Sequence, residues 1–246
     1  MAKARSRPKS AGPRRLPRGR HALAPEEVVR DQRERLLAAV PGVVAKRGYE
    51  AMSVADLVKA AAVSRNAFYK NFKDKQDCFA TAHEAGHERL FETLSLPCED
   101  GATIEERVGR SLGAALDTLA SEPEVARLLF VEAPSAGEEI ALRYHEWLGH
   151  YGTLLRAAAP GLPSGSIPTP EVEGVIVGGI ASRVASEVLQ GRGDQLRDLK
   201  EPLVEYVLAF YRLAEPGPEP GKVVPLEQEQ EAAPEYLEAR RRQAGA

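Results

Sequence analysis

Hydrophobic side chains recur at helical spacing along most of this chain. Between residues 25 and 48 an apolar residue returns every three or four positions, and the same period reappears up to residue 213. We find no run with the strict alternation of a half-buried strand. The pattern therefore predicts an all-α protein. The expected helices cover about 25–48, 53–61, 64–72, 74–94, 103–120, 123–132, 137–158, 171–190 and 199–213.

Short polar residues mark the starts of three of these helices. Ser53, Ser64 and Asp74 each precede a helical segment, where a side-chain oxygen can accept a hydrogen bond from an unpaired backbone N–H. Gly48 is expected to end the first helix. Pro41 lies inside that helix and predicts a kink or a local unwinding, because proline removes one backbone hydrogen bond.

Composition divides the chain into four parts. Residues 1–24 contain eight Lys and Arg and no acidic residue, which predicts a disordered basic arm. The Pro- and Gly-containing segment Leu96–Ala102 predicts a junction between an N-terminal domain, residues 25–95, and a C-terminal helical domain, residues 102–213. Residues 214–246 are rich in Pro and Glu and are expected to form a disordered acidic tail.

Charge is distributed unevenly between the two ends of the chain. Residues 1–75 contain 18 Lys and Arg against 7 Asp and Glu, whereas the remainder contains 15 against 29. A basic front and an acidic back predict that the front meets a polyanion. Cys78 and Cys98 are too few for a disulfide framework, and no apolar run reaches the roughly 20 residues that span a bilayer. We therefore expect a cytoplasmic protein without a membrane segment.

Residues 53–72 connect this pattern to a function. They read as two short helices joined by a tight turn, and the second helix is polar on one side and aromatic on the other. A helix-turn-helix has this arrangement, and its second helix enters the major groove of DNA. Arg65 and Asn66 stand in the first turn of that helix, where Arg can pair with guanine edges and Asn with adenine edges. Phe68 and Phe72 are expected to hold the helix against the core.

Residues 28–94 resemble the DNA-binding domain of the TetR family of transcriptional regulators. The matching positions, in order, are Arg47-Gly48-Tyr49, Ser53-Val54, the run from Val63 to Tyr69, Phe72 and Lys75. Ala62 departs from the family, which often has Gly in this turn, and a positive φ there would strain the backbone by about 1 kcal/mol.

The resemblance implies a homodimeric regulator, most simply a repressor, that binds a double-stranded operator and a small-molecule effector and uses no cofactor. It supports phosphate contacts by Tyr69 and Lys75, and helix N-termini favour anions on physical grounds. The expected DNA-binding residues are Ser53, Ser64, Arg65, Asn66, Tyr69, Lys70 and Lys75.

The C-terminal half predicts an interface between subunits and a ligand pocket. The helices expected at 171–190 and 199–213 carry apolar faces, and in the family the last two large helices form the dimer interface. The alternative is that they close the core of a monomer. The family resemblance also implies an effector pocket, although each of its expected aromatic residues could instead be ordinary core. These residues are Phe130, Tyr144, Trp147 and Tyr151.

One further motif suggests a different chemistry. Residues 83–87 read His-Glu-Ala-Gly-His, so His83 and His87 share a helix face at zinc-ligand spacing, with Glu84 as a potential general base. A zinc-dependent hydrolase and a regulatory metal site are the resulting alternatives. The motif falls on the fourth helix, and a further ligand at the usual downstream spacing is not evident. We therefore expect no enzyme and no metal site, with an effector-independent DNA-binding protein as the remaining alternative.

Overall fold

The computed structural model describes residues 25–99, 103–160 and 167–213, and these residues are helical almost throughout. No strand occurs in these three ranges, so the prediction of an all-α fold is confirmed. The basic arm and the acidic tail expected at the two ends of the chain lie outside the described residues.

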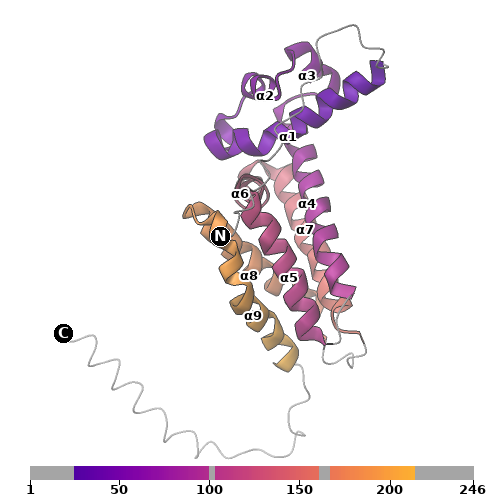
Figure 1. Ribbon diagram of the computed structural model, residues 1–246, viewed down its shortest axis with the longest axis vertical. Coiled ribbons are helices and arrows are strands. Elements are labelled where there is room, and N and C mark those ends of the chain that lie inside the picture. The colour runs from indigo at the N-terminus through magenta and orange to yellow at the C-terminus, as the bar shows by residue number, and fades with distance from the viewer. Residues whose placement is uncertain (1–24, 100–102, 161–166, 214–246) are drawn as a thin grey trace, which may run out of the picture.

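Four helices build the N-terminal part of the molecule. Three of them lie together at one end: α1 (Pro25–Ala51), α2 (Val54–Ala61) and α3 (Arg65–Asn71). The fourth, α4 (Lys75–Glu99), begins beside them and continues into the C-terminal bundle (Figure 1). This continuous helix connects the two parts of the protein.

Local chemistry explains where these helices begin. Ser53 and Asp56 cap each other at the start of α2, and Ser64 Oγ accepts the Ala67 N–H at 3.0 Å at the start of α3. Asp74 Oδ1 accepts the Asp77 N–H at 2.9 Å at the start of α4. The three predicted caps are therefore confirmed.

Two helices differ from the expectation because packing overrides a local signal. The break in α1 lies at Gly48, where φ is 73° and ψ is 163°, and the unwinding expected at Pro41 does not occur. Val40 and Val44 on either side of Pro41 are fully buried and fix this part of α1 against the core. Helix α4 was expected to end near residue 94 but runs through Pro97 to Glu99, so it occupies the first part of the segment in which the junction was expected.

The C-terminal part is a bundle whose helices run along its length, with α4 among them (Figure 1). In place of one expected helix over 123–132, a short α-helix passes into a π-helical turn, η1, in which each N–H bonds five residues back. The elements are α5 (Ile104–Ser121), α6 (Pro123–Arg127), η1 (Leu128–Glu132), the 3₁₀ turn η2 (Ala133–Ser135), α7 (Glu138–Ala157), α8 (Pro170–Leu189), the 3₁₀ segment η4 (Gly193–Leu199) and α9 (Lys200–Leu213).

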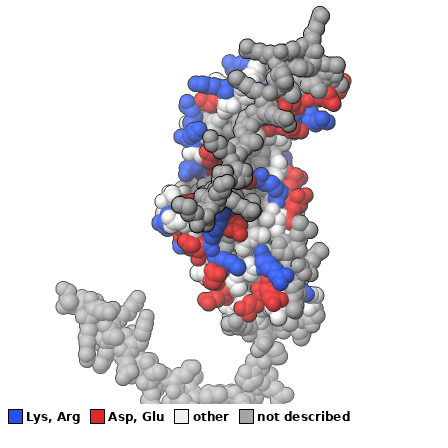
Figure 2. Space-filling view, viewed as in Figure 1, with Lys and Arg blue, Asp and Glu red and all other residues white. Residues whose placement is uncertain are grey.

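The two parts share one continuous apolar core. Buried side chains run from Leu36 in α1 through Leu129 in η1 to Val207 in α9. Helix α1 packs on α6 and η1, so this end of the bundle lies under the N-terminal helices; we call it the proximal end. Acidic and basic side chains are mixed over the bundle face seen in Figure 2. Within the described ranges no helix is long and apolar enough to cross a membrane.

Candidate DNA-recognition surface and ligand cavity

Helix α3 has one buried face and one exposed face. Ala67 and Phe68 pack inward, as does Phe72 directly after the helix, in line with the core role expected for both phenylalanines. The opposite face turns four polar or aromatic side chains to solvent, and the Tyr69 side chain is 51% exposed. The Arg65 guanidinium lies 5.9 Å from the Tyr69 ring centre. The exposed residues of α3 are Arg65, Asn66, Tyr69 and Lys70.

Two arginines of α1 hold this helix and the preceding turn in place. Arg33 donates to the Asn71 carbonyl at 3.1 Å and lies over the Phe72 ring. Arg35 donates to the carbonyls of Ala61 and Ala62 at the end of α2. Ala62 has φ 52° and ψ 44°, so the turn uses the left-handed conformation that the sequence raised as a source of strain. The Arg35 contacts offset that strain, and nothing in the local sequence marks them.

The three remaining expected DNA contacts lie at helix N-termini. Ser53 and Ser64 are exposed, and their hydroxyls cap α2 and α3. The Lys75 ammonium donates to the carbonyls of Tyr49, Glu50 and Met52 at 3.1, 3.0 and 3.2 Å. Its three N–H groups therefore close the end of α1, and a phosphate contact by this side chain stays a prediction.

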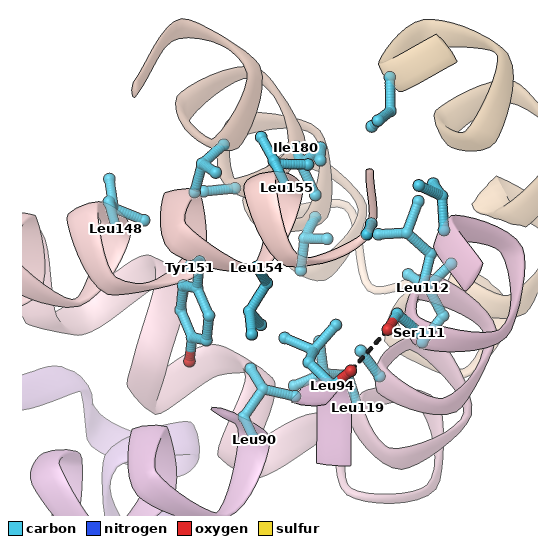
Figure 3. A pocket seen from close by; sticks show the side chains of 18 of the residues that line it. Leu90, Leu94, Ser111, Leu112, Leu119, Leu148, Tyr151, Leu154, Leu155 and Ile180 are labelled. Carbon is cyan, nitrogen blue, oxygen red and sulfur yellow. Dashed lines mark hydrogen bonds between the residues drawn. The ribbon is translucent and has the colours of Figure 1, made fainter. Parts of the chain in front are cut away.

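A cavity opens within the bundle between α4, α5, α7 and α8 (Figure 3). The enclosed cavity volume is about 100 Å³, and the space between the lining side chains reaches about 800 Å³ when the part open to solvent is included. Its lining has no charged side chain, and its hydroxyl groups come from Ser111 and Tyr151. The Ser111 hydroxyl already donates to the Leu94 carbonyl at 2.5 Å. Aliphatic residues dominate the wall, among them Leu90, Leu94, Leu112, Leu154, Leu155 and Ile180.

Two of the four aromatic residues expected in a pocket line this cavity. Phe130 and Tyr151 belong to its wall. Tyr144 and Trp147 instead surround His87, with the Trp147 ring stacked at 5.4 Å and an interplanar angle of 11°. The sequence analysis missed the aliphatic wall because a leucine stripe on a helix looks the same whether it lines a cavity or fills a core.

His83 and His87 form a buried hydrogen-bonded pair. Their Nε2 atoms are 3.0 Å apart, and His87 Nδ1 lies 2.7 Å from the Tyr151 hydroxyl. Burial lowers the pKa of His83 to about 4, helped by the charge of Arg143. Burial and then the neighbouring His83 lower the pKa of His87 to about 2. Both imidazoles are therefore neutral at pH 7.

This arrangement does not support the zinc-hydrolase alternative. The two imidazoles bond to each other, and the second nitrogen of His87 is engaged by a tyrosine. Within the described residues no group of three or more His, Cys, Asp or Glu side chains converges as a metal site would require. Cys78 is also buried, and burial raises the pKa of its thiol to about 12, so it is poorly suited to redox chemistry.

Comparison with known proteins agrees with the geometry of the N-terminal helices. Residues 36–82 match the model of bacterial regulatory proteins of the tetR family. The chain carries a TetR-family DNA-binding domain. The match covers α2, α3, most of α1 and the start of α4, and therefore includes the whole helix-turn-helix.

Similarity to known regulator proteins extends over the C-terminal bundle. The fatty acid metabolism regulator protein of Bacillus subtilis strain 168 is 22% identical over 161 residues, which are 65% of this chain and 78% of that protein. The structure of the B. subtilis regulator FadR in complex with stearoyl-CoA is 20% identical, with a TM-score of 0.64 over 72% of this chain and 98% of that one. FadR from Bacillus halodurans is 22% identical, with a TM-score of 0.63 over 71% and 97%. Family and fold together identify a DNA-binding transcriptional regulator.

Proposed function

We propose that this protein is a homodimeric transcriptional repressor that leaves its operator when a long-chain fatty acyl thioester occupies the bundle cavity. The observation that carries the proposal is the apolar cavity in the same bundle whose proximal end supports the helix-turn-helix. A ligand that prefers a different arrangement of that bundle changes DNA affinity by as much as it discriminates between the two arrangements.

The exposed face of α3 supports sequence-specific reading of DNA. Arg65 and Asn66 lie in its first turn and are exposed among the described residues, where major-groove recognition needs base-reading side chains. Tyr69 and Lys70 lie one turn further along, within reach of the phosphate backbone. Ser53, Ser64 and the N–H groups at the start of α4 supply the remaining phosphate contacts in this proposal.

The lining of the cavity supports an alkyl chain as the ligand. It offers no charge, so an anionic or strongly polar head group must stay outside. The names of two similar proteins mention fatty acid metabolism and stearoyl-CoA. Along α5 the wall extends from Val108 to Leu119, which at 1.5 Å per residue is roughly 16 Å. An extended chain advances about 1.2 Å per single bond, so about 14 bonds fill this length.

The outer face of α8 supports a dimer. Val175 and Leu189 are each 62% exposed, and Gly179, Ser182 and Ser186 lie between them at helical spacing on the same face. We call these five residues the α8 stripe. Ser182 and Ser186 permit close approach by a second helix, whereas Gly179 already lies against Tyr206 of α9 in the same chain. The half-buried rings of Tyr206 and Phe210 extend the stripe. A two-fold dimer through this stripe would place two α3 helices on successive major grooves, roughly 34 Å apart.

The decisive experiment measures DNA binding with and without acyl thioester. Fluorescence anisotropy on duplexes from the promoter region beside its own gene is expected to show specific binding. Stearoyl-CoA should release the DNA, whereas free CoA and octanoyl-CoA should not. A variant with a filled cavity, Ala115→Phe, should bind DNA but resist release, and the exposed substitution Ala85→Phe serves as its control.

Two results would count against this proposal in different ways. Specific binding that no acyl thioester reverses would favour the effector-independent alternative. Asn66→Ala tests the DNA-reading part by itself, and it should lose about 1–3 kcal/mol of discrimination at one base position. Unchanged specificity in this variant and in Arg65→Ala would show that α3 does not read the operator.

A further inference from the structure

We propose that Glu132 in the π-helical turn η1 is a latch that holds the DNA-binding domain in its unliganded position, and that cavity occupancy opens it through Phe130. This inference rests on the proposed function, because it needs a ligand in the cavity and an operator to be released. Glu132 is a positioning residue in this scheme, because it contacts neither the DNA nor the ligand.

The latch joins the C-terminal bundle to the end of α1. Glu132 Oε2 accepts the Tyr49 backbone N–H at 2.9 Å. Tyr49 follows Gly48, whose left-handed φ of 73° breaks α1 immediately before this N–H. The other oxygen, Oε1, accepts from Arg127 at 3.0 Å and 2.9 Å. One carboxylate is thus tied on one side to the DNA-binding domain and on the other to Arg127 at the end of α6.

The same turn forms part of the cavity wall. Phe130 lies two residues before Glu132 and lines the cavity at its proximal end. Residues two apart point to roughly opposite sides of a helical turn, so Phe130 faces the cavity while Glu132 faces Tyr49. A ligand that displaces Phe130 therefore moves the carboxylate on the far side of the turn.

The turn also contacts the helix that links the two domains. A Cβ added at Gly86 of α4 would lie 2.9 Å from Leu129 Cδ2, so α4 and η1 touch with no space to spare. Within four residues, η1 thus meets α4, the cavity and the end of α1. A π-helical turn can rearrange locally into tighter helix, because its extra residue can be redistributed along the chain. These properties suit an element with two arrangements, of which the latch selects one.

The test compares Glu132→Ala with Glu146→Ala, which removes an exposed carboxylate of α7. Loss of the latch favours the ligand-bound arrangement. Binding of stearoyl-CoA without DNA, measured by calorimetry, should therefore tighten at least about fivefold. The stearoyl-CoA concentration that half-releases the operator should fall by a similar factor. Glu132→Gln keeps an acceptor for the Tyr49 N–H and should lie between the two, whereas Glu146→Ala should match wild type.

A second measurement needs neither ligand nor DNA. Hydrogen exchange at the Tyr49 amide should accelerate at least about fivefold in Glu132→Ala and stay unchanged in Glu146→Ala, because the acceptor of that N–H is gone only in the first. Unaccelerated Tyr49 exchange overturns the latch whatever the effector is. Wild-type ligand affinity and release in Glu132→Ala overturn its coupling role and leave the proposed function standing. Failure of stearoyl-CoA to release the wild-type protein, with accelerated Tyr49 exchange in the variant, overturns the proposed effector and leaves the latch contact established.

Discussion

Single side chains that saturate the carbonyl ends of helices determine much of the local geometry. Lys75 closes the end of α1 and Arg35 closes the end of α2, in both cases from a different helix. Both contacts bridge residues more than 20 positions apart in the sequence. The sequence therefore indicates a lysine at the start of α4, but its partners become visible only once the helices are packed.

Replacement of Lys75 should lower the stability of the fold, whether or not this side chain also contacts DNA. Lys75→Met removes a charged donor from three carbonyls, and the free energy of unfolding is expected to fall by about 1–3 kcal/mol in urea denaturation. Lys73→Met, at an exposed neighbouring position, should cost little. If Lys75 acts through phosphate alone, stability will instead stay the same and the salt dependence of DNA binding will become shallower.

Acid should destabilise the protein through the buried histidine pair. The folded-state pKa values of about 4 for His83 and about 2 for His87 lie below the ordinary value near 6.5, so the unfolded state takes up protons first as pH falls. Their contribution to stability is complete above about pH 6.5 and decreases as pH falls from there, toward about 4 for His83 and about 2 for His87. The expected loss is up to about 1.4 kcal/mol per pH unit for each histidine.

Urea unfolding at pH 7 and pH 5.5 measures this loss. The double variant His83→Phe/His87→Phe should lose most of the difference between the two pH values, whereas His150→Gln, at an exposed position, should keep it. An equal pH dependence in all three proteins would show that the pair is not responsible.

At the level of elements, sequence patterns predicted helices well where a local cap defines them. Ser53, Ser64 and Asp74 gave correct starts because each cap is made within a few residues of itself. The π-helical turn η1 was not predicted, because no local residue pattern distinguishes a π-helical turn from a turn of α-helix. The part of the cavity wall on α5 was not predicted for a similar reason. Helical periodicity shows which face of a helix is buried, but it does not show what that face packs against.

The α8 stripe gives an element-level test of the proposed dimer. Leu189→Arg places a charge in the expected interface and should convert the dimer to monomer in sedimentation or light-scattering measurements. Operator affinity should then fall at least tenfold, because each half-site is bound alone. Leu142→Arg is the matched control, since Leu142 is 58% exposed on α7 and outside the stripe. A Leu189→Arg protein that stays dimeric would exclude this surface.

At the level of the whole molecule, the order of helices and the place of the helix-turn-helix could be predicted, whereas the connection between the two parts could not. Helix α4 continues into the expected junction, and Glu132 bonds to a backbone group 83 positions earlier. Such contacts depend on how the helices pack, which apolar periodicity does not define. For the same reason the sequence indicated Phe130 and Tyr151 as pocket residues but did not separate them from Tyr144 and Trp147.

A cavity ligand should stabilise the entire fold. At stearoyl-CoA concentrations near 100 times its dissociation constant, the gain is about 2.7 kcal/mol, which for a protein of this size raises the melting temperature by roughly 5–10 °C. Differential scanning fluorimetry measures the shift, and Ala115→Phe should abolish it. An equal shift in both proteins would place the ligand elsewhere.

The cavity also bears on how long each copy of the protein survives. A ligand that fills it would give the surrounding side chains additional contacts, so a ligand-bound copy should unfold less readily and be open to proteases less often. With the proposed effector, copies of the regulator in a cell would be degraded faster when long-chain acyl thioesters are scarce and would accumulate when they are plentiful.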